Sequence, residues 1–147
     1  MRLNIAESFK TCDKIYFPHN CDFRGRVYPI PPHLNHMGPD INRGILTFSE
    51  GKPLGEEGLY WLKVHMANKW GKDKLPLNDR AKYAEDMMDD IHRIADDPRN
   101  NLDWLKADSP WQALGCIFEL SRAMRSPCPK DYICHLHVHV DGSCNGM

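Results

Sequence analysis

Residues 109–125, with the sequence SPWQALGCIFELSRAMR, decide the fold of this protein. Ser109 can cap a helix, Pro110 suits its first position, and Gln112 completes the S-x-x-Q pattern of a capping box. The helix that begins there is expected over 110–125 and is apolar on most of its sides, through Trp111, Leu114, Ile117, Phe118 and Leu120. Such a helix is buried and must be covered from more than one direction.

Other helices are expected to provide that cover. Four apolar residues at helical spacing predict a helix over 55–70, ended by glycine: Leu59, Leu62, Met66, Trp70 and then Gly71. A second helix is expected over 78–95, with an apolar stripe on one side and acidic residues within 85–97 on the other. Shorter helical segments are expected at 2–10, at 41–49 behind a cap at Asp40, and at 101–106.

The β structure is predicted to be limited. Two β-prone runs, 15–17 and 26–30, flank a Pro-His-Asn turn signal and predict a hairpin. The β-branched, alternating stretch 132–140 predicts a strand. The predicted fold class is therefore α+β and mainly helical, with a β-hairpin, a final strand and several packed helices.

Composition bounds the class of protein. The 147 residues are 41% hydrophobic and 27% charged, which suits one globular domain. No apolar run approaches the ~20 residues that span a bilayer, and the first residues resemble neither a signal nor a transit peptide, so no membrane partner or targeting segment is expected in this chain. The net charge of -1 argues mildly against a stand-alone nucleic-acid binder, although positive charge gathers at 24–26.

The stretch 137–141, HVHVD, suggests a metal site. Side chains alternate along a strand, so His135, His137, His139 and Asp141 are expected to share one face. Imidazoles two residues apart can bind zinc together, but the pattern also fits a strand with a polar, partly solvated face. Asp141 followed by Gly142 equally suits a hard cation such as Mg²⁺, or simply the start of a turn.

A second group of polar residues lies at 22–28, DFRGRVY. If this stretch is extended, Asp22, Arg24, Arg26 and Tyr28 share a face. Arginine binds phosphate through two parallel hydrogen bonds, Gly25 allows close backbone approach, and Asp22 can hold one arginine in place. The pattern indicates contact with a nucleic-acid backbone, with a structural Asp–Arg pair as the alternative.

Three stretches together, in this order and at these separations, resemble the phage-type single-subunit DNA-directed RNA polymerases: DFRGRVYPIPPHLNHMGPD, GKPLGEEGLYWLKVHMAN and HVDGSCNG. The mitochondrial branch is the most similar, and the resemblance covers 3–147. It implies that the chain is the N-terminal part of the polymerase palm. Fingers, the second palm half and the N-terminal region are then expected outside it.

The resemblance also implies roles for residues. Asp141 corresponds to one of two catalytic aspartates that hold two Mg²⁺ ions, and the carbonyl of Gly142 faces a metal. Arg24, Arg26 and Tyr28 correspond to residues near the template–transcript hybrid, and Arg43 to a weaker basic contact with nucleic acid. The second catalytic carboxylate is expected outside this chain, so the isolated chain is expected to be inactive.

The implied reaction is template-directed ribonucleotidyl transfer in mitochondrial transcription. The RNA 3′-hydroxyl attacks the α-phosphate of a ribonucleoside triphosphate, and two metal ions stabilise the attacking and leaving oxygens. DNA template, RNA transcript, ribonucleoside triphosphates and mitochondrial transcription factors are the implied partners. Two alternatives remain: a metal-dependent hydrolase using His137, His139 and Asp141, and a non-enzymatic helical interaction domain that docks through the acidic face at 85–97.

Overall fold

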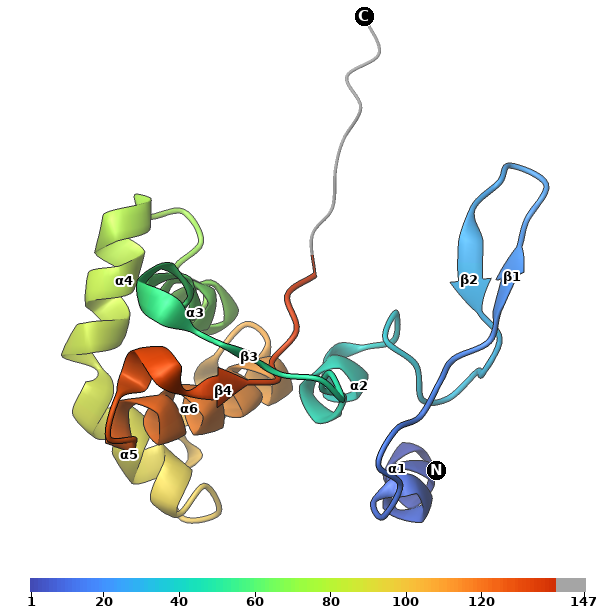
Figure 1. Ribbon diagram of the computed structural model, residues 1–147. Helices are drawn as coiled ribbons and strands as arrows, with labels where there is room; N and C mark the ends of the chain where they lie inside the picture. The colour runs from blue at the N-terminus through green and yellow to red at the C-terminus, as the bar shows by residue number, and fades with distance from the viewer. Residues whose placement is uncertain (140–147) are drawn as a thin grey trace, which may run out of the picture.

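The computed structural model describes residues 1–139, and the predicted metal residues Asp141 and Gly142 lie outside this range. Within it the fold is mixed and dominated by helices, with six α-helices and two small antiparallel sheets (Figure 1). The predicted central helix is confirmed as α6, Pro110–Arg125. It contacts α2, Asp40–Ile45, α3, Gly55–Trp70, and α5, Met88–Asp96, so it is covered from several directions as expected.

The hydrophobic core lies where α3, α5 and α6 meet. Its buried members come from these helices, from α4, Leu77–Asp86, and from the 3₁₀ helix η1, Leu102–Lys106: Leu62, Met66, Ala84, Ile91, Ile94, Trp104, Cys116, Ile117 and Leu120. Burial of each large apolar side chain contributes about 1.5–3 kcal/mol to folding. The core therefore anchors α6 firmly, and the other elements take their positions from it.

The start of α6 differs from the prediction. The side chain of Ser109 makes no capping hydrogen bond. Instead, the carboxylate of Asp40, on α2, accepts hydrogen bonds from the backbone N–H groups of Trp111 and Gln112. The predicted cap of α2 at Asp40 is also wrong, because Pro39 precedes that helix and Asp40 lies in its first turn.

The predicted helix over 78–95 is two helices, α4 and α5, separated at Met87, whose φ of -89° and ψ of 6° leave the helical range. This break lets α4 pack against α3 and α5 pack against α6. The helix over 55–70 is confirmed, and Gly71 ends it in the left-handed conformation, at a φ of 103°.

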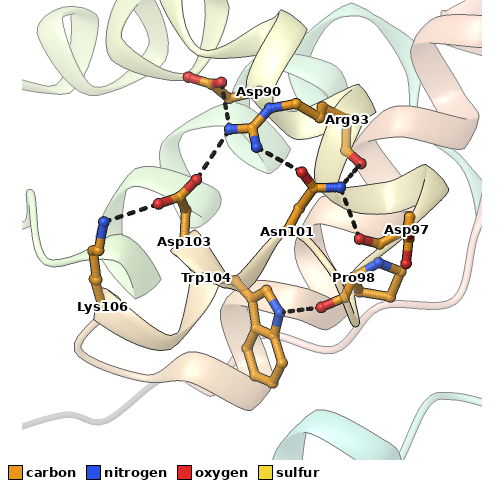
Figure 2. Close-up of polar contacts among 8 residues, drawn as sticks. All are labelled: Asp90, Arg93, Asp97, Pro98, Asn101, Asp103, Trp104 and Lys106. Carbon is orange, nitrogen blue, oxygen red and sulfur yellow. Dashed lines mark hydrogen bonds and ion pairs between the residues drawn. The ribbon is translucent and has the colours of Figure 1, made fainter.

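The acidic side of α4 and α5 is largely occupied by contacts within the chain. Glu85 pairs with Lys63, and Asp96 pairs with Arg125. Figure 2 shows the region between α5 and η1, where Arg93 donates to Asp90, Asp103 and the side chain of Asn101. A set of charges already paired in this way is less suited to docking a partner than the sequence suggested.

The hairpin is confirmed, but its first strand is misplaced in the prediction. Strand β1, His19–Cys21, pairs antiparallel with β2, Val27–Pro29, and residues 15–17 form no strand. The turn lies at 22–25 instead of at the Pro-His-Asn sequence, because Asp22 and Gly25 supply the turn geometry. Figure 1 shows the hairpin standing away from the bundle of α3 to α6, on the side of α1, Arg2–Phe9.

The predicted final strand is much shorter in the described residues. Strand β4, Ile133–Cys134, pairs antiparallel with β3, Lys52–Pro53, just after the short 3₁₀ helix η2, Pro129–Asp131. The chain continues extended enough for the backbones of Phe48 and His135 to form a hydrogen bond of 2.9 Å. Pro53, on β3, has no backbone N–H to donate to β4. Among residues 1–139, β3 is the one strand that pairs with β4.

No helix within 1–139 combines the length and apolar character needed to cross a membrane.

Candidate nucleic-acid interface

Asp22 organises the loop at the tip of the hairpin. Its Oδ1 accepts hydrogen bonds from the backbone N–H groups of Arg24, at 2.8 Å, and Arg26, at 3.0 Å. The N–H of Gly25 donates to the carbonyl of Asp22, and Gly25 has a φ of 80°. This is the three-residue hairpin loop in which a turn is followed by a left-handed residue, and glycine adopts that conformation without steric cost.

The same carboxylate holds the side chain of Arg24. Asp22 Oδ2 accepts from Arg24 Nε, at 3.2 Å, and from Nη2, at 3.0 Å, and Nη2 also reaches the hydroxyl of Tyr28, at 3.3 Å. The backbone hydrogen bond from Arg26, followed by the bonds from Arg24, lowers the pKa of Asp22 and keeps it anionic. The prediction that Asp22 fixes one arginine is confirmed.

Arg26 is held differently from Arg24. Its backbone is bound to Asp22, but its side chain is exposed and forms no hydrogen bond within residues 1–139. Phe23, beside it at the tip, is 97% exposed, and its ring lies 5.8 Å from the Arg24 guanidinium carbon. The condition for one shared face, an extended backbone over 22–28, is not met because 22–26 form a turn. The turn still presents two arginines and an aromatic ring to solvent.

Arg43 lies in a separate basic cluster, which we define as His36, Arg43, Lys69, His137 and His139. Arg43 is half-buried on α2, and its Nε donates to the carbonyl of Gly38 at 3.1 Å. The rings of His137 and His139 are 4.7 Å apart. His36 extends the cluster toward the hairpin, because its ring lies 5.1 Å from that of His19 on β1.

Burial and mutual repulsion act on these groups together. Burial, and after it the charges of His137, Arg43 and Lys69, lower the pKa of His139 to about 4. Burial, followed by the charge of Arg43, also lowers the pKa of Lys69. In the part of the chain that the structure describes, neither Arg43 nor Lys69 forms a salt bridge with a carboxylate. Because the pKa values of His36, His137 and His139 are all lowered, these histidines are neutral near pH 7, and the positive charge of the cluster, which favours an anion, comes from Arg43 and Lys69.

A groove opens beside the basic cluster. Its volume is about 1080 Å³, and its walls come from α1, from 12–17, from 45–49 and from 137–139. Its lining combines apolar side chains, such as Phe9, Phe17 and Phe48, with polar ones of both signs of charge: Glu7, Lys10, Asp13, Lys14, His36, Arg43 and His139. The groove is large enough for an extended segment of polymer rather than a single small ion.

The predicted zinc site is not assembled in the described residues. His135 is directed to the carbonyl of Phe48, at 2.8 Å, while His137 and His139 lie against each other. Within 1–139 no group of three or more His, Cys, Asp or Glu side chains is arranged to hold a metal ion. A site that includes Asp141 falls outside these residues.

Sequence reasoning did not single out Lys69 and His65, on α3, or Asp40 as part of this region. The spacing of His65 and Lys69, four residues apart on one helix, was the available signal. It pointed to a shared helical face but not to Arg43 and 137–139, which reach that face from distant parts of the chain.

The comparisons with known proteins agree with the resemblance seen in the sequence. A family model described as DNA-dependent RNA polymerase matches residues 52–147. The mitochondrial DNA-directed RNA polymerase of Neurospora crassa is 50% identical over 147 residues, covering 99% of this chain and 10% of that protein. The human mitochondrial enzyme is 48% identical, covering 99% of this chain and 12% of its own length.

DNA-directed RNA polymerase 2, chloroplastic/mitochondrial, of Arabidopsis thaliana is 47% identical and covers all of this chain and 15% of its own length. The chain thus spans between a tenth and a sixth of the length of these relatives. The matches support a polymerase over the hydrolase and interaction-domain alternatives. They show that the chain belongs to the DNA-dependent RNA polymerase family, of the phage type.

Proposed function

We propose that this chain is part of a mitochondrial DNA-directed RNA polymerase that carries out template-directed ribonucleotidyl transfer. The observation that carries this proposal is near 50% identity along essentially the whole chain to polymerases named mitochondrial. DNA template, RNA transcript and ribonucleoside triphosphates are the proposed partners, with mitochondrial transcription factors for the full enzyme. We assign residues 1–147 to the N-terminal half of the palm, with the remaining parts of the active site supplied from outside it.

Asp141 is the proposed catalytic and metal-binding residue, and Gly142 contributes its carbonyl. A carboxylate and a carbonyl are hard oxygen donors, which fit Mg²⁺ better than the imidazoles of His137 and His139 do. Two bound Mg²⁺ ions would supply Lewis-acid activation of the RNA 3′-hydroxyl and stabilisation of the leaving pyrophosphate. The proposed role of this chain is to supply the carboxylate of Asp141 to that site.

Arg24, Arg26, Tyr28 and Arg43 are the proposed nucleic-acid contacts. Asp22 fixes the Arg24 guanidinium, so Arg24 loses little side-chain entropy when it meets a phosphate. Arg26 is free to form two parallel hydrogen bonds with a phosphate, and Tyr28, 40% exposed, offers a ring beside it. Arg43 lines the groove, where its positive charge attracts the same backbone.

A substitution in a full-length polymerase carrying these residues tests the proposal. Asp141→Asn is expected to reduce RNA extension by roughly 10³-fold or more, because a neutral amide is a poor ligand for a hard cation. Binding of a template–transcript hybrid, measured by fluorescence anisotropy, is expected to change little. Asp131→Asn, an exposed aspartate ten residues earlier in η2, is the matched control and should extend RNA normally. Near-normal extension by Asp141→Asn, or lost binding with retained turnover, contradicts the assigned role.

A further inference from the structure

The carboxylate of Asp40 joins α2 to α6. Its Oδ2 accepts a hydrogen bond from the N–H of Trp111 at 2.8 Å, and its Oδ1 accepts from the N–H and the side-chain amide of Gln112, both at 3.1 Å. The two backbone N–H groups belong to the first turn of α6, where the helix dipole favours an anion. Asp40 therefore caps a helix that begins about 70 residues later in the chain.

Gly44 forms a second contact between the same helices. A Cβ added at Gly44 would lie 2.7 Å from the backbone carbonyl carbon and oxygen of Trp111. A Cβ added at Gly115 would lie 3.4 Å from the carbonyl oxygen of Gly44. The two backbones thus approach as closely as glycine allows, one turn of helix away from Asp40.

Arg43 lies between these two contacts. The six residues of α2 are too few to form a stable helix alone, so its orientation depends on what it packs against. The side chain of Arg43 has one hydrogen bond within the described residues, to the carbonyl of Gly38, which precedes α2 by two residues. The direction of its guanidinium is therefore set by α2, and the direction of α2 is set by the contacts of Asp40 and Gly44 with α6.

We propose that Asp40 is a positioning residue that holds Arg43 in the orientation needed to contact nucleic-acid phosphate. The proposal rests on the nucleic-acid role proposed for Arg43. Its physical basis is that Asp40 directs both carboxylate oxygens to the amides of α6 and forms no salt bridge with Arg43 in residues 1–139. Among these residues the guanidinium therefore has no carboxylate in salt-bridge contact, while its helix is fixed to the core.

Whether removal of Asp40 strengthens or weakens phosphate binding distinguishes a positioning role from a simple electrostatic one. Asp40 carries a negative charge near Arg43 and Lys69, so its removal should strengthen phosphate binding if charge alone matters. If Asp40 positions Arg43, its removal should weaken binding instead, because a misplaced guanidinium no longer meets the phosphate. A purely stabilising cap would change the thermal midpoint of the protein and leave the phosphate contact intact.

The test uses a full-length polymerase carrying these residues and an RNA–DNA hybrid as the probe. Binding is measured at several salt concentrations for Arg43→Ala, Asp40→Ala, the double variant and a control, Asp79→Ala, which removes an acid from the first turn of α4. Arg43→Ala is expected to reduce the slope of log affinity against log salt by about one, as for one lost phosphate contact. Asp40→Ala should weaken binding and reduce the slope similarly, the double variant should add nothing further, and the control should leave the slope unchanged.

Each result decides between the possibilities. A normal slope for Arg43→Ala overturns the role of Arg43 and with it the positioning of Arg43 by Asp40. A reduced slope for Arg43→Ala, with tighter binding or an unchanged slope for Asp40→Ala, overturns the positioning role alone. Additive losses in the double variant also contradict it. If Asp40→Ala does not fold, Asp40→Asn keeps one carbonyl oxygen as an acceptor, and it is expected to give a slope between those of the parent protein and Arg43→Ala.

Discussion

His65 should make the stability of this protein depend on pH in the acidic range. It lies on α3 against a small cavity of about 10 Å³, lined also by Arg43, Gln112 and His137, with room for at most one water molecule. Burial, and after it the charges of Lys69, His137 and His139, lower its pKa from 6.5 to about 4. The folded protein therefore keeps this imidazole neutral under conditions in which the unfolded chain protonates it.

The direction and size of this change in stability follow from how many protons His65 binds in the folded and in the unfolded protein. Because the folded pKa is lower than the unfolded pKa, the unfolded chain binds more protons between pH 6.5 and pH 4, so stability is lost as the pH falls through this window. With the two pKa values of 6.5 and about 4, lowering the pH from ~7.5 to ~5 costs about 2 kcal/mol from this residue alone.

Urea denaturation of the 147-residue chain, followed by tryptophan fluorescence at both pH values, measures this loss. His65→Gln removes the titrating group while keeping a polar side chain, so its stability should fall by about 2 kcal/mol less over the same pH range. The lowered pKa values of His137 and His139 act in the same direction but are present in both proteins, so the difference isolates His65. His33→Gln, at an exposed histidine, is the control and should match the parent chain. Equal losses in the parent chain and His65→Gln would refute the reasoning.

Two further predictions concern stability and use the same urea assay at neutral pH. Asn101→Ala removes three side-chain hydrogen bonds, with the Arg93 guanidinium and with the carbonyls of Arg93 and Asp97, and should cost about 2 kcal/mol (Figure 2). Asn100→Ala beside it removes one exposed side-chain hydrogen bond, to the Asp97 carboxylate, and should cost ~0.5 kcal/mol or less. Equal costs at the two asparagines would contradict a special role for this contact. Gly71→Ala should cost about 1–2 kcal/mol, because Gly71 has a φ of 103° and an added Cβ would lie 2.8 Å from the Asp108 carboxylate. Gly58→Ala, inside α3, has only ordinary contacts at 3.5 Å and should stabilise the chain by about 0.5–1 kcal/mol; stabilisation at both positions would show that Gly71 is unstrained.

Local patterns predicted most of the helices correctly. The helices over 55–70 and 110–125 could be predicted from the spacing of their apolar residues, because helical periodicity depends only on residues three and four apart. The sequence does not reveal the break at Met87, since Met87 and Met88 both pack against the core and keep the apolar stripe continuous across it. The first strand of the hairpin was misplaced because the turn depends on the hydrogen bonds of Asp22 with Arg24 and Arg26, which a composition-based turn signal does not reveal.

The candidate site likewise has parts that the sequence predicts and parts that it does not. The Asp22–Arg24 pair could be predicted because the two residues are separated by one position. The roles of Asp141, Gly142, Arg26 and Tyr28 stay predictions from resemblance. The environment of Arg43 could not be predicted, because Lys69 and 137–139 reach it from other elements.

The amino-acid sequence by itself determined most of the helical segments, the presence of a hairpin and the polymerase family, because these depend on short-range periodicity and on motifs whose order along the chain is directly readable. Tertiary structure alone decided that Asp40 caps α6 rather than its own helix, and that Arg43 joins Lys69, His137 and His139 in one basic cluster. The physical reason is the same in both cases. A hydrogen-bond acceptor or a charge acts on whatever lies within a few ångströms, and only the packing of α2 and α3 around α6 determines which distant residues those are.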